Sequence, residues 1–384
     1  MSGRWRRLYN GETTADFFGR RWWGFGLSIT LLLVTVGSLF IQGLNLGIDF
    51  KGGVAWEAPA TKDLTIDSAR EVLEANKVDA GNAKIQTLGS GDGERIRVQV
   101  GEQPADVRDA VQADLAKKSG VESVDVSVSD VSSSWGRSIT EKAIRALLVF
   151  FLLVSIYIAW RFEWKMALAA IVAMAHDVVV SVGVYSVFQF EVTPATVIAF
   201  LTILGYSLYD TVVVFDKVKE NADRFAGQRV SYADITNVSM NQVLMRSLNT
   251  SFSSLLPVLS LLLLGAGLLG AVALQEFALA LFVGMTTGAY SSICVATPLL
   301  TLVKQREPKY RSLAGQMSLG SEMTQLATTG APVSRRSSRT AARPGSGSET
   351  ETGPREDADI VGSAAQRAAA VLSHPPRPRK KRRR

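Results

Sequence analysis

Six long apolar blocks constrain the fold of this chain more than any other feature of its sequence. Each block approaches or exceeds the roughly 20 helical residues needed to cross a hydrocarbon core of about 30 Å. The blocks cover residues 22–44, 143–160, 167–188, 192–216, 248–270 and 277–303. With 47% hydrophobic residues in 384 positions, the composition agrees. The sequence therefore predicts a polytopic α-helical membrane protein with six transmembrane helices.

Lys and Arg residues are distributed unevenly among the segments that join these blocks. They occur in the segments 1–21, 161–166, 217–247 and 304–311, whereas 189–191 and 271–276 contain none. By the positive-inside rule, both termini and the loop 217–247 are predicted to be cytoplasmic. The first block is predicted to remain as an anchor, because its apolar stretch is too long for a signal peptide and no small-x-small site follows before Asp49.

The same topology places residues 45–139 outside the cytoplasm. Turn signals and alternating or helical apolar patterns predict strands and helices in the order βαββαβ, that of an α+β ferredoxin-like domain. The predicted strands are 53–58, 84–88, 94–100 and 121–128, and the predicted helices are 65–77 and 105–117. The segment has 16 acidic and 11 basic residues, with no His and no Cys. These features favour a binding or mechanical module over an enzyme.

The last predicted segment, 304–384, differs in composition from both the apolar blocks and the segment 45–139. It contains 17 basic and 7 acidic residues, a surplus of ten (17 − 7) that exceeds the net charge of +7 for the whole chain. Rich in Ser, Thr, Gly and Arg and without apolar periodicity, it is predicted to be a disordered basic cytoplasmic tail. The basic character therefore does not mark a nucleic-acid domain. Attraction to anionic lipids is the simpler interpretation, and docking to an acidic partner or ribosomal RNA is the alternative.

Three carboxylates interrupt the apolar blocks. Asp177 lies about ten residues from each end of the third block, where a charge costs on the order of 2.5 to 3.5 kcal/mol. Measured from the turn between the third and fourth blocks, Asp177 is roughly 16 Å deep, Asp210 roughly 25 Å deep, and Asp216 near the cytoplasmic surface. This descending series suits a proton path. The alternative is structural pairing with a basic group of another helix or subunit.

Neighbouring residues extend this candidate site. Tyr206 and Ser207 precede Asp210 by four and three positions, so both hydroxyls are predicted to share a helix face with it. Asp216 is interpreted as an interfacial anchor near Lys217, with a functional role as the alternative. His176 adjoins Asp177 and is interpreted as packing, with a proton relay as the alternative.

The remaining polar and small residues in the blocks point mainly to packing. Asn249 belongs to a polar start of the fifth block, which predicts a hydrogen-bonded seam or a wet cavity lining. Gly284 and Gly288 form a G-x-x-x-G pair that predicts close helix contact. Cys294 is the single cysteine, so the sequence predicts neither a disulfide nor a metal site of the usual cysteine spacing.

Four stretches resemble a known family. They are LGIDFKGG at 46–53, GYSLYDTVVVFDKVKEN at 205–221, RSLNTS at 246–251 and FALALFVGMTTGAYSSICVATPLL at 277–300. In the same order and over roughly residues 20 to 305, they are similar to the SecF branch of the SecD/SecF family of bacterial protein-export subunits, which belongs to the RND superfamily. The resemblance implies an accessory subunit in the cytoplasmic membrane that acts with SecD, and often YajC, at the SecYEG channel. It also implies use of the proton-motive force, without a cofactor, late in preprotein crossing, after the ATPase SecA has acted.

Residue by residue, the resemblance implies roles for two groups. Asp49, Gly52 and Gly53 match the junction where the extracytoplasmic domain leaves the first span. The intramembrane polar positions are matched by Asp177, Gly205, Tyr206, Asp210 and Asp216. Two positions depart from the family pattern: Tyr209 replaces a common Asn beside Asp210, and Lys217 replaces a common Arg after Asp216. Lys217 keeps the charge but loses a planar bidentate donor.

A six-span chain without an internal repeat corresponds to half of a twelve-span RND transporter, so a second half is expected from SecD. Two other functions stay open. One is an RND-type half-transporter that exports a lipid or small molecule, which predicts a deep apolar pocket in the soluble domain. The other is a non-transporting scaffold of the translocase. An enzyme is disfavoured, because the sequence offers no nucleophile, metal cluster or phosphate loop.

Overall fold

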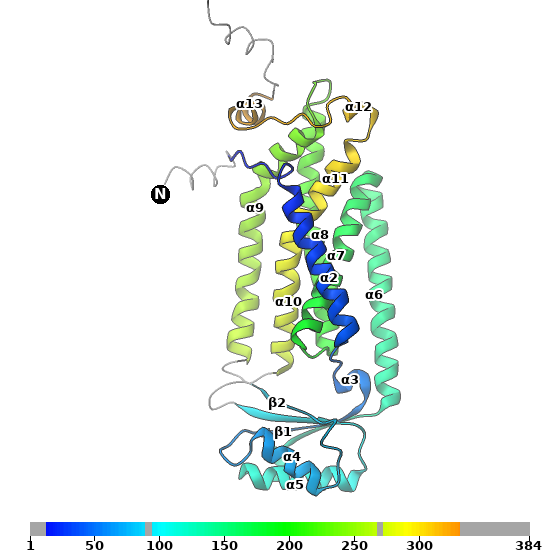
Figure 1. Cartoon of the computed structure of the whole chain (residues 1–384), viewed down its shortest axis with the longest axis vertical. Coiled ribbons are helices and arrows are strands. Elements are labelled where there is room, and N and C mark those ends of the chain that lie inside the picture. The colour runs from blue at the N-terminus through cyan, green and yellow to red at the C-terminus, as the bar shows by residue number, and fades with distance from the viewer. Residues whose placement is uncertain (1–12, 89–93, 267–271, 331–384) are drawn as a thin grey trace, which may run out of the picture. The chain divides into compact units, whose positions relative to one another are not determined.

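The computed structural model describes residues 13–88, 94–266 and 272–330 of the chain (Figure 1). Its contacts divide the chain into two compact units, Met1–Val333 and Ser334–Arg384. The first unit contains a helical bundle and a small α+β domain. The second falls outside the described residues.

Six helices in the described ranges are long and apolar enough to cross a membrane, which confirms the predicted number of spans. Large apolar side chains point outward from several of them; Phe40 is 87% exposed and Trp160 84% exposed. Such exposed apolar helix surfaces are stable when they face the lipid of a membrane. The helices are α2 (Arg21–Ile41), α6 (Ser133–Arg161), α7 (Trp164–Phe188), α8 (Pro194–Arg224), α9 (Tyr232–Ser260) with η3 (Leu261–Ala266), and α10 (Val272–Ser291) with η4 (Ser292–Ala296) and α11 (Thr297–Lys304).

Local signals explain where the central hairpin of helices turns. Gln189 adopts a left-handed conformation with φ of 54° and ends α7. Four residues on, the Thr193 side chain caps α8 in a capping box with Thr196, and Pro194 occupies the first turn. The short connector forces α7 and α8 to run antiparallel, as the sequence predicts.

The α+β domain contains one four-stranded antiparallel sheet in the order β2-β3-β1-β4. Helices α4 and α5 cover one face of the sheet (Figure 1), over a core that includes the fully buried Trp56 and Leu73. The elements are β1 (Gly53–Pro59), α4 (Ile66–Ala75), β2 (Lys84–Leu88), β3 (Arg95–Val100), α5 (Ala105–Ser119), η2 (Ser123–Asp125) and β4 (Ser127–Val131). This order and pairing agree with the predicted ferredoxin-like arrangement.

Three predicted boundaries are wrong. Helix α6 begins at Ser133, inside the stretch assigned to the soluble domain, because Ser132 caps it directly after β4. The predicted loop 217–247 is largely helical, since α8 continues to Arg224 and α9 begins at Tyr232. These added turns contain polar and charged residues, which interrupt the apolar blocks before the helices themselves begin or end.

The first part of the predicted disordered tail is also ordered. Beyond α11, the chain forms α12 (Pro308–Arg311) and α13 (Ser321–Thr329). Met323 and Leu326 of α13 are each 1% exposed and join the apolar core at the end of the bundle away from the sheet (Figure 1). Burial of these two side chains stabilises α13 against the bundle. The average composition of residues 304–384 does not indicate this short apolar contact. The predicted disorder of residues 331–384 lies outside the described residues.

Candidate functional site

Asp177 is fully buried on α7 and lies where three helices meet. Its Oδ2 accepts a 2.5 Å hydrogen bond from Ser207 Oγ of α8 and a 2.8 Å bond from Ser291 Oγ of α10. On the other side, His176 Nδ1 lies 3.1 Å from Asp177 Oδ1. Two hydroxyls and an imidazole therefore surround the Asp177 carboxyl. Each of these three groups can change its hydrogen bonding when the carboxyl gains or loses a proton.

The hydroxyl contacts of Asp177 depend on close packing of α10 against α8. A Cβ atom added to Gly288 would lie 2.9 Å from Ser207 Cβ, and one added to Gly284 would meet the side chain of Ile203. The predicted close contact at these two glycines is therefore confirmed. It brings Ser291, one turn beyond Gly288, within reach of Asp177.

Asp210 forms a second, separate cluster. It is 4% exposed on α8, and Ser247 Oγ of α9 lies 2.7 Å and 2.9 Å from its two oxygens. One hydroxyl proton is thus shared by both carboxyl oxygens. Among the described residues, neither Asp177 nor Asp210 forms an ion pair or hydrogen bond with a Lys or Arg.

Tyr206 and Ser207 are spaced to share a helix face with Asp210, but their hydroxyls bond to other groups. Ser207 points to Asp177 of the neighbouring helix, and Tyr206 Oη donates to the backbone carbonyl of Thr250 at 3.3 Å. Helical spacing shows which residues share a face but not which neighbouring helix that face meets. The structure therefore transfers Ser207 from one carboxyl to the other.

The accessory residues differ in their contacts. Asp216 pairs with Arg161 of α6 at 3.2 Å, whereas Lys217 pairs with Glu220 at 2.8 Å. The anchor interpretation of Asp216 thus has a physical basis, but with Arg161 in place of Lys217. His176 turns its ring toward the carboxyl of its sequence neighbour Asp177. Asn249 is exposed on α9.

Two hydroxyls of the site escape sequence reasoning. Ser247 is the second residue of the RSLNTS stretch, two positions before the run of polar side chains that begins at Asn249. Ser291 follows the glycine pair, and the sequence alone indicates only a packing motif there. A search for hydroxyls one turn from a small-residue contact would have found Ser291.

The junction residues form a tight backbone corner between the domain and the bundle. Gly52 and Gly53 have φ values of 80° and 131°, which L side chains rarely adopt. A Cβ atom on Gly52 would lie 2.6 Å from Ser133 Cα at the start of α6. Asp49 lies just before them in the short helix α3 (Ile48–Lys51). Burial raises the pKa of its carboxyl, Arg97 partly opposes this rise, and Glu191 adds to it.

In the described ranges, no group of three or more His, Cys, Asp or Glu side chains is arranged to hold a metal ion. Cys294 is a free thiol. The carboxyl, hydroxyl and imidazole groups of the two clusters can bind protons and exchange hydrogen bonds.

Fold and site together define a class: a multi-pass membrane protein with the organisation of an RND-type half, carrying a small α+β domain and buried intramembrane carboxyls. Residues 111–306 match the family model for the C-terminal part of the protein export membrane proteins SecD/SecF, and residues 37–54 match the SecD/SecF GG motif. The chain belongs to the SecD/SecF family of protein-export membrane proteins.

Several relatives cover most of the chain. It is 43% identical over 308 residues to the protein translocase subunit SecF of Streptomyces coelicolor, covering 80% of this chain and 81% of that one. Against the subunit SecF of Petrotoga mobilis, identity is 35%, covering 76% and 97%. A crystal structure of SecDF from Thermus thermophilus, described as translocon-associated, superposes with a TM-score of 0.70 at 32% identity, covering 77% of this chain and 39% of that one.

Proposed function

We propose that the chain is a SecF-type subunit of the Sec protein translocase that, together with SecD, uses the proton-motive force to promote late stages of preprotein translocation across the cytoplasmic membrane. The observation that carries this proposal is Asp177, a fully buried carboxyl at the centre of a span that is held by hydroxyls and an imidazole. A permanent charge without a cationic partner is costly there. Reversible protonation removes that cost and supplies the coupling step.

Partners follow from the relatives. One relative, from Thermus thermophilus, is named protein translocase subunit SecDF, so its name combines SecD and SecF for a single chain. The present chain covers 39% of that relative. This supports SecD as the second half. In the proposal, the pair acts at the SecYEG channel, with SecA and YajC as further partners and the preprotein as substrate. Both termini are cytoplasmic in this proposal, and the chain is neither an enzyme nor dependent on a cofactor.

The half-transporter alternative gains little from the domain. A cavity of about 790 Å³ lies between α4 and α5. Most of the residues that line it are charged, namely Lys62, Asp63, Glu71, Asp114, Lys117 and Lys118. An apolar substrate needs an apolar pocket, so this cavity does not favour export of a lipid.

Export by the reconstituted translocase, with and without a proton gradient, tests the proposal. Asp177→Asn and Asp210→Asn each keep the shape of the side chain but cannot exchange a proton at neutral pH. We expect each substitution to remove the gradient-dependent part of export and to leave the part driven by SecA. Full gradient-dependent export in both variants, with normal assembly, would support the non-transporting scaffold instead.

A further inference from the structure

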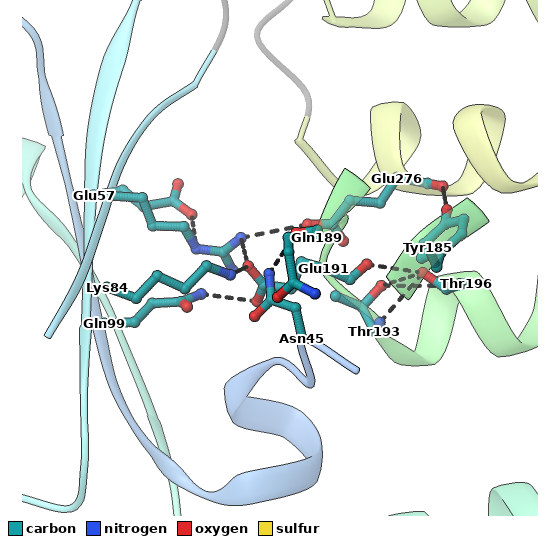
Figure 2. Close-up of polar contacts among 11 residues, drawn as sticks. Asn45, Glu57, Lys84, Gln99, Tyr185, Gln189, Glu191, Thr193, Thr196 and Glu276 are labelled. Carbon is teal, nitrogen blue, oxygen red and sulfur yellow. Dashed lines mark hydrogen bonds and ion pairs between the residues drawn. The ribbon is translucent and has the colours of Figure 1, made fainter. Parts of the chain in front are cut away.

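A polar cluster joins the sheet of the soluble domain to the ends of the membrane helices (Figure 2). Arg97 of β3 is its centre: Nη1 lies 3.4 Å from Glu276 Oε1 of α10 and 3.9 Å from Glu191 Oε2 in the connector between α7 and α8. Arg97 Nε also lies 3.2 Å from Glu57 Oε1 of β1. The arginine therefore contacts the domain and two separate parts of the bundle at once.

Neighbouring side chains hold Glu191 firmly against the domain. Lys84 Nζ lies 2.8 Å from Glu191 Oε2, and Gln99 Nε2 donates to Glu191 Oε1 at 2.8 Å (Figure 2). The side chain of Glu191 is only 7% exposed. Three carboxylates thus face two cations here, so loss of Arg97 would leave the glutamates repelling one another across the junction.

Strand register explains why these side chains face the membrane. Successive residues of a strand point to opposite faces of a sheet. Ile96 and Val98 are buried in the domain core under α4 and α5, so Arg97 and Gln99 point the other way. Lys84 is paired with Gln99 and Glu57 with Arg97, which places all four side chains on the membrane-facing side.

The helices that meet Arg97 are those that meet Asp177. Glu276 and Ser291 lie on α10, and Glu191 precedes α8, which carries Ser207. At 1.5 Å per residue, Glu276 and Ser291 are separated by roughly 22 Å along α10, and Ser207 lies roughly 20 Å along α8 from its first residue, Pro194. α8 and α10 are therefore connected at two levels. One connection runs through Asp177 inside the membrane, and the other runs through Arg97 at the domain.

Protonation would alter the inner connection directly. Asp177 Oδ2 accepts hydrogen bonds from both serines, and a proton bound at Oδ2 turns this oxygen into a donor, so the two serine bonds cannot both persist in the same form. A shift of α8 against α10 changes the distance between Glu191 and Glu276. The fork of Arg97 then cannot keep its contacts with both.

From this geometry we infer that Arg97 is a positioning residue, which sets the orientation of the soluble domain according to whether α8 and α10 are held together at Asp177. The inference rests on the proposed function, for which it supplies the link between proton binding and domain movement. The contacts of Lys84 and Gln99 with Glu191 keep the domain docked on the connector. Arg97 contacts Glu276 of α10, so its contacts change when α10 moves.

Distance measurements between spin labels test this link. Labels on Cys residues introduced at Val124, 82% exposed in the domain, and Phe188, 64% exposed at the end of α7, lie outside the cluster. Cys294 is the single native cysteine and is first replaced by Ala. In the full chain co-purified with SecD, we expect Asp177→Asn to shift the mean distance by about 2 Å or more. Ser291→Ala should shift it in the same direction by less.

The decisive variant is Arg97→Gln. We expect it to abolish the change in the distance distribution that Asp177→Asn causes, whereas Arg108→Gln should preserve that change. Arg108 serves as the matched control because it loses the same charge but pairs with Asp130 inside the domain. Identical distributions with and without Asp177→Asn, or a difference that survives Arg97→Gln, would overturn the inference. Parallel export assays separate it from the proposed function, since the label distance can respond to Asp177 whether or not export depends on the gradient.

Discussion

Ser207 Oγ on α8 donates a 2.5 Å hydrogen bond to Asp177 Oδ2 on α7, and Ser291 Oγ on α10 donates to the same oxygen. One carboxyl oxygen thereby joins three spans. Hydroxyls can donate or accept, so they can follow a change in protonation of the carboxyl, which a Lys or Arg partner would oppose by fixing the charge. This property distinguishes the cluster from a structural ion pair.

Removal of either hydroxyl should weaken the cluster. In Ser207→Ala and Ser291→Ala, the ionised carboxyl loses one donor, which costs on the order of 1.5–3 kcal/mol for a hydrogen bond to a charged group. We expect the gradient-dependent part of export to fall in each variant and the melting temperature of the purified complex to decrease. Ser155→Ala is the control, because Ser155 donates only to the Phe151 carbonyl of its own helix in the recorded contacts. Equal loss in all three variants would contradict a specific role for the cluster.

Gly288→Ala tests the helix contact that positions this cluster. The added methyl group would lie 2.9 Å from Ser207 Cβ, so α8 and α10 must separate or Ser207 must turn away from Asp177. We expect a destabilisation of about 1–3 kcal/mol and reduced gradient-dependent export. Gly26→Ala in α2 is the matched control, since nothing lies within 4 Å of its added Cβ atom. Wild-type melting and export by Gly288→Ala would exclude tight packing here.

The sequence predicts both buried carboxyls, Asp177 and Asp210, but not the side chains that contact them. Block length sufficed for the number of spans, and strand and helix patterns sufficed for the order of elements along the α+β domain. The partner of Ser207 depends instead on which helix packs against its face, and that is a tertiary property. Ser247 and Ser291 were missed for the same reason: a serine in a membrane helix becomes informative only when the residue opposite is known.

The junction cluster was beyond sequence reasoning for a related reason. Arg97 and Glu276 are 179 residues apart, and each looks like an ordinary solvated charge near the end of its element. Only the docking of the sheet on the helix ends brings them together. In the absence of aligned relatives, no periodicity within either segment carries that information.

Asp49 gives a pH dependence of defined sign. Burial raises the pKa of its carboxyl above the ordinary value of 3.8, with Arg97 lowering it in part. The folded state thus binds this proton more tightly than the unfolded state, so the stabilisation is complete below 3.8 and is lost as the pH rises through the folded-state pKa. Because Asp49→Asn does not titrate, we expect the stability of the wild type relative to this variant to decrease as the pH rises through that range. Thermal melts at a series of pH values measure it.

Asp79 provides a control of opposite sign. Hydrogen bonds from Asn82 and from the Gly81 backbone lower the pKa of its carboxyl. The stability of the wild type relative to Asp79→Asn should therefore increase as the pH rises toward 3.8 and stay level above it. Arg97→Gln should move the Asp49 transition to higher pH, since Arg97 lowers that pKa. A pH-independent difference between wild type and Asp49→Asn would contradict the assigned environment.

His176 offers the sharpest choice between the packing and relay interpretations. Its Nδ1 lies 3.1 Å from Asp177 Oδ1, its Nε2 is buried without a hydrogen-bond partner among the described residues, and its ring centroid lies 6.4 Å from that of Tyr290. Asn can place a polar atom at the position of Nδ1 but cannot replace the second ring nitrogen, whereas Phe keeps only the ring. We expect His176→Asn to retain most gradient-dependent export and His176→Phe to lose it, because the contact with Asp177 is made through Nδ1 alone. Retention by Phe and loss by Asn would assign the residue to packing, and loss in both variants would require Nε2 to carry the proton onward.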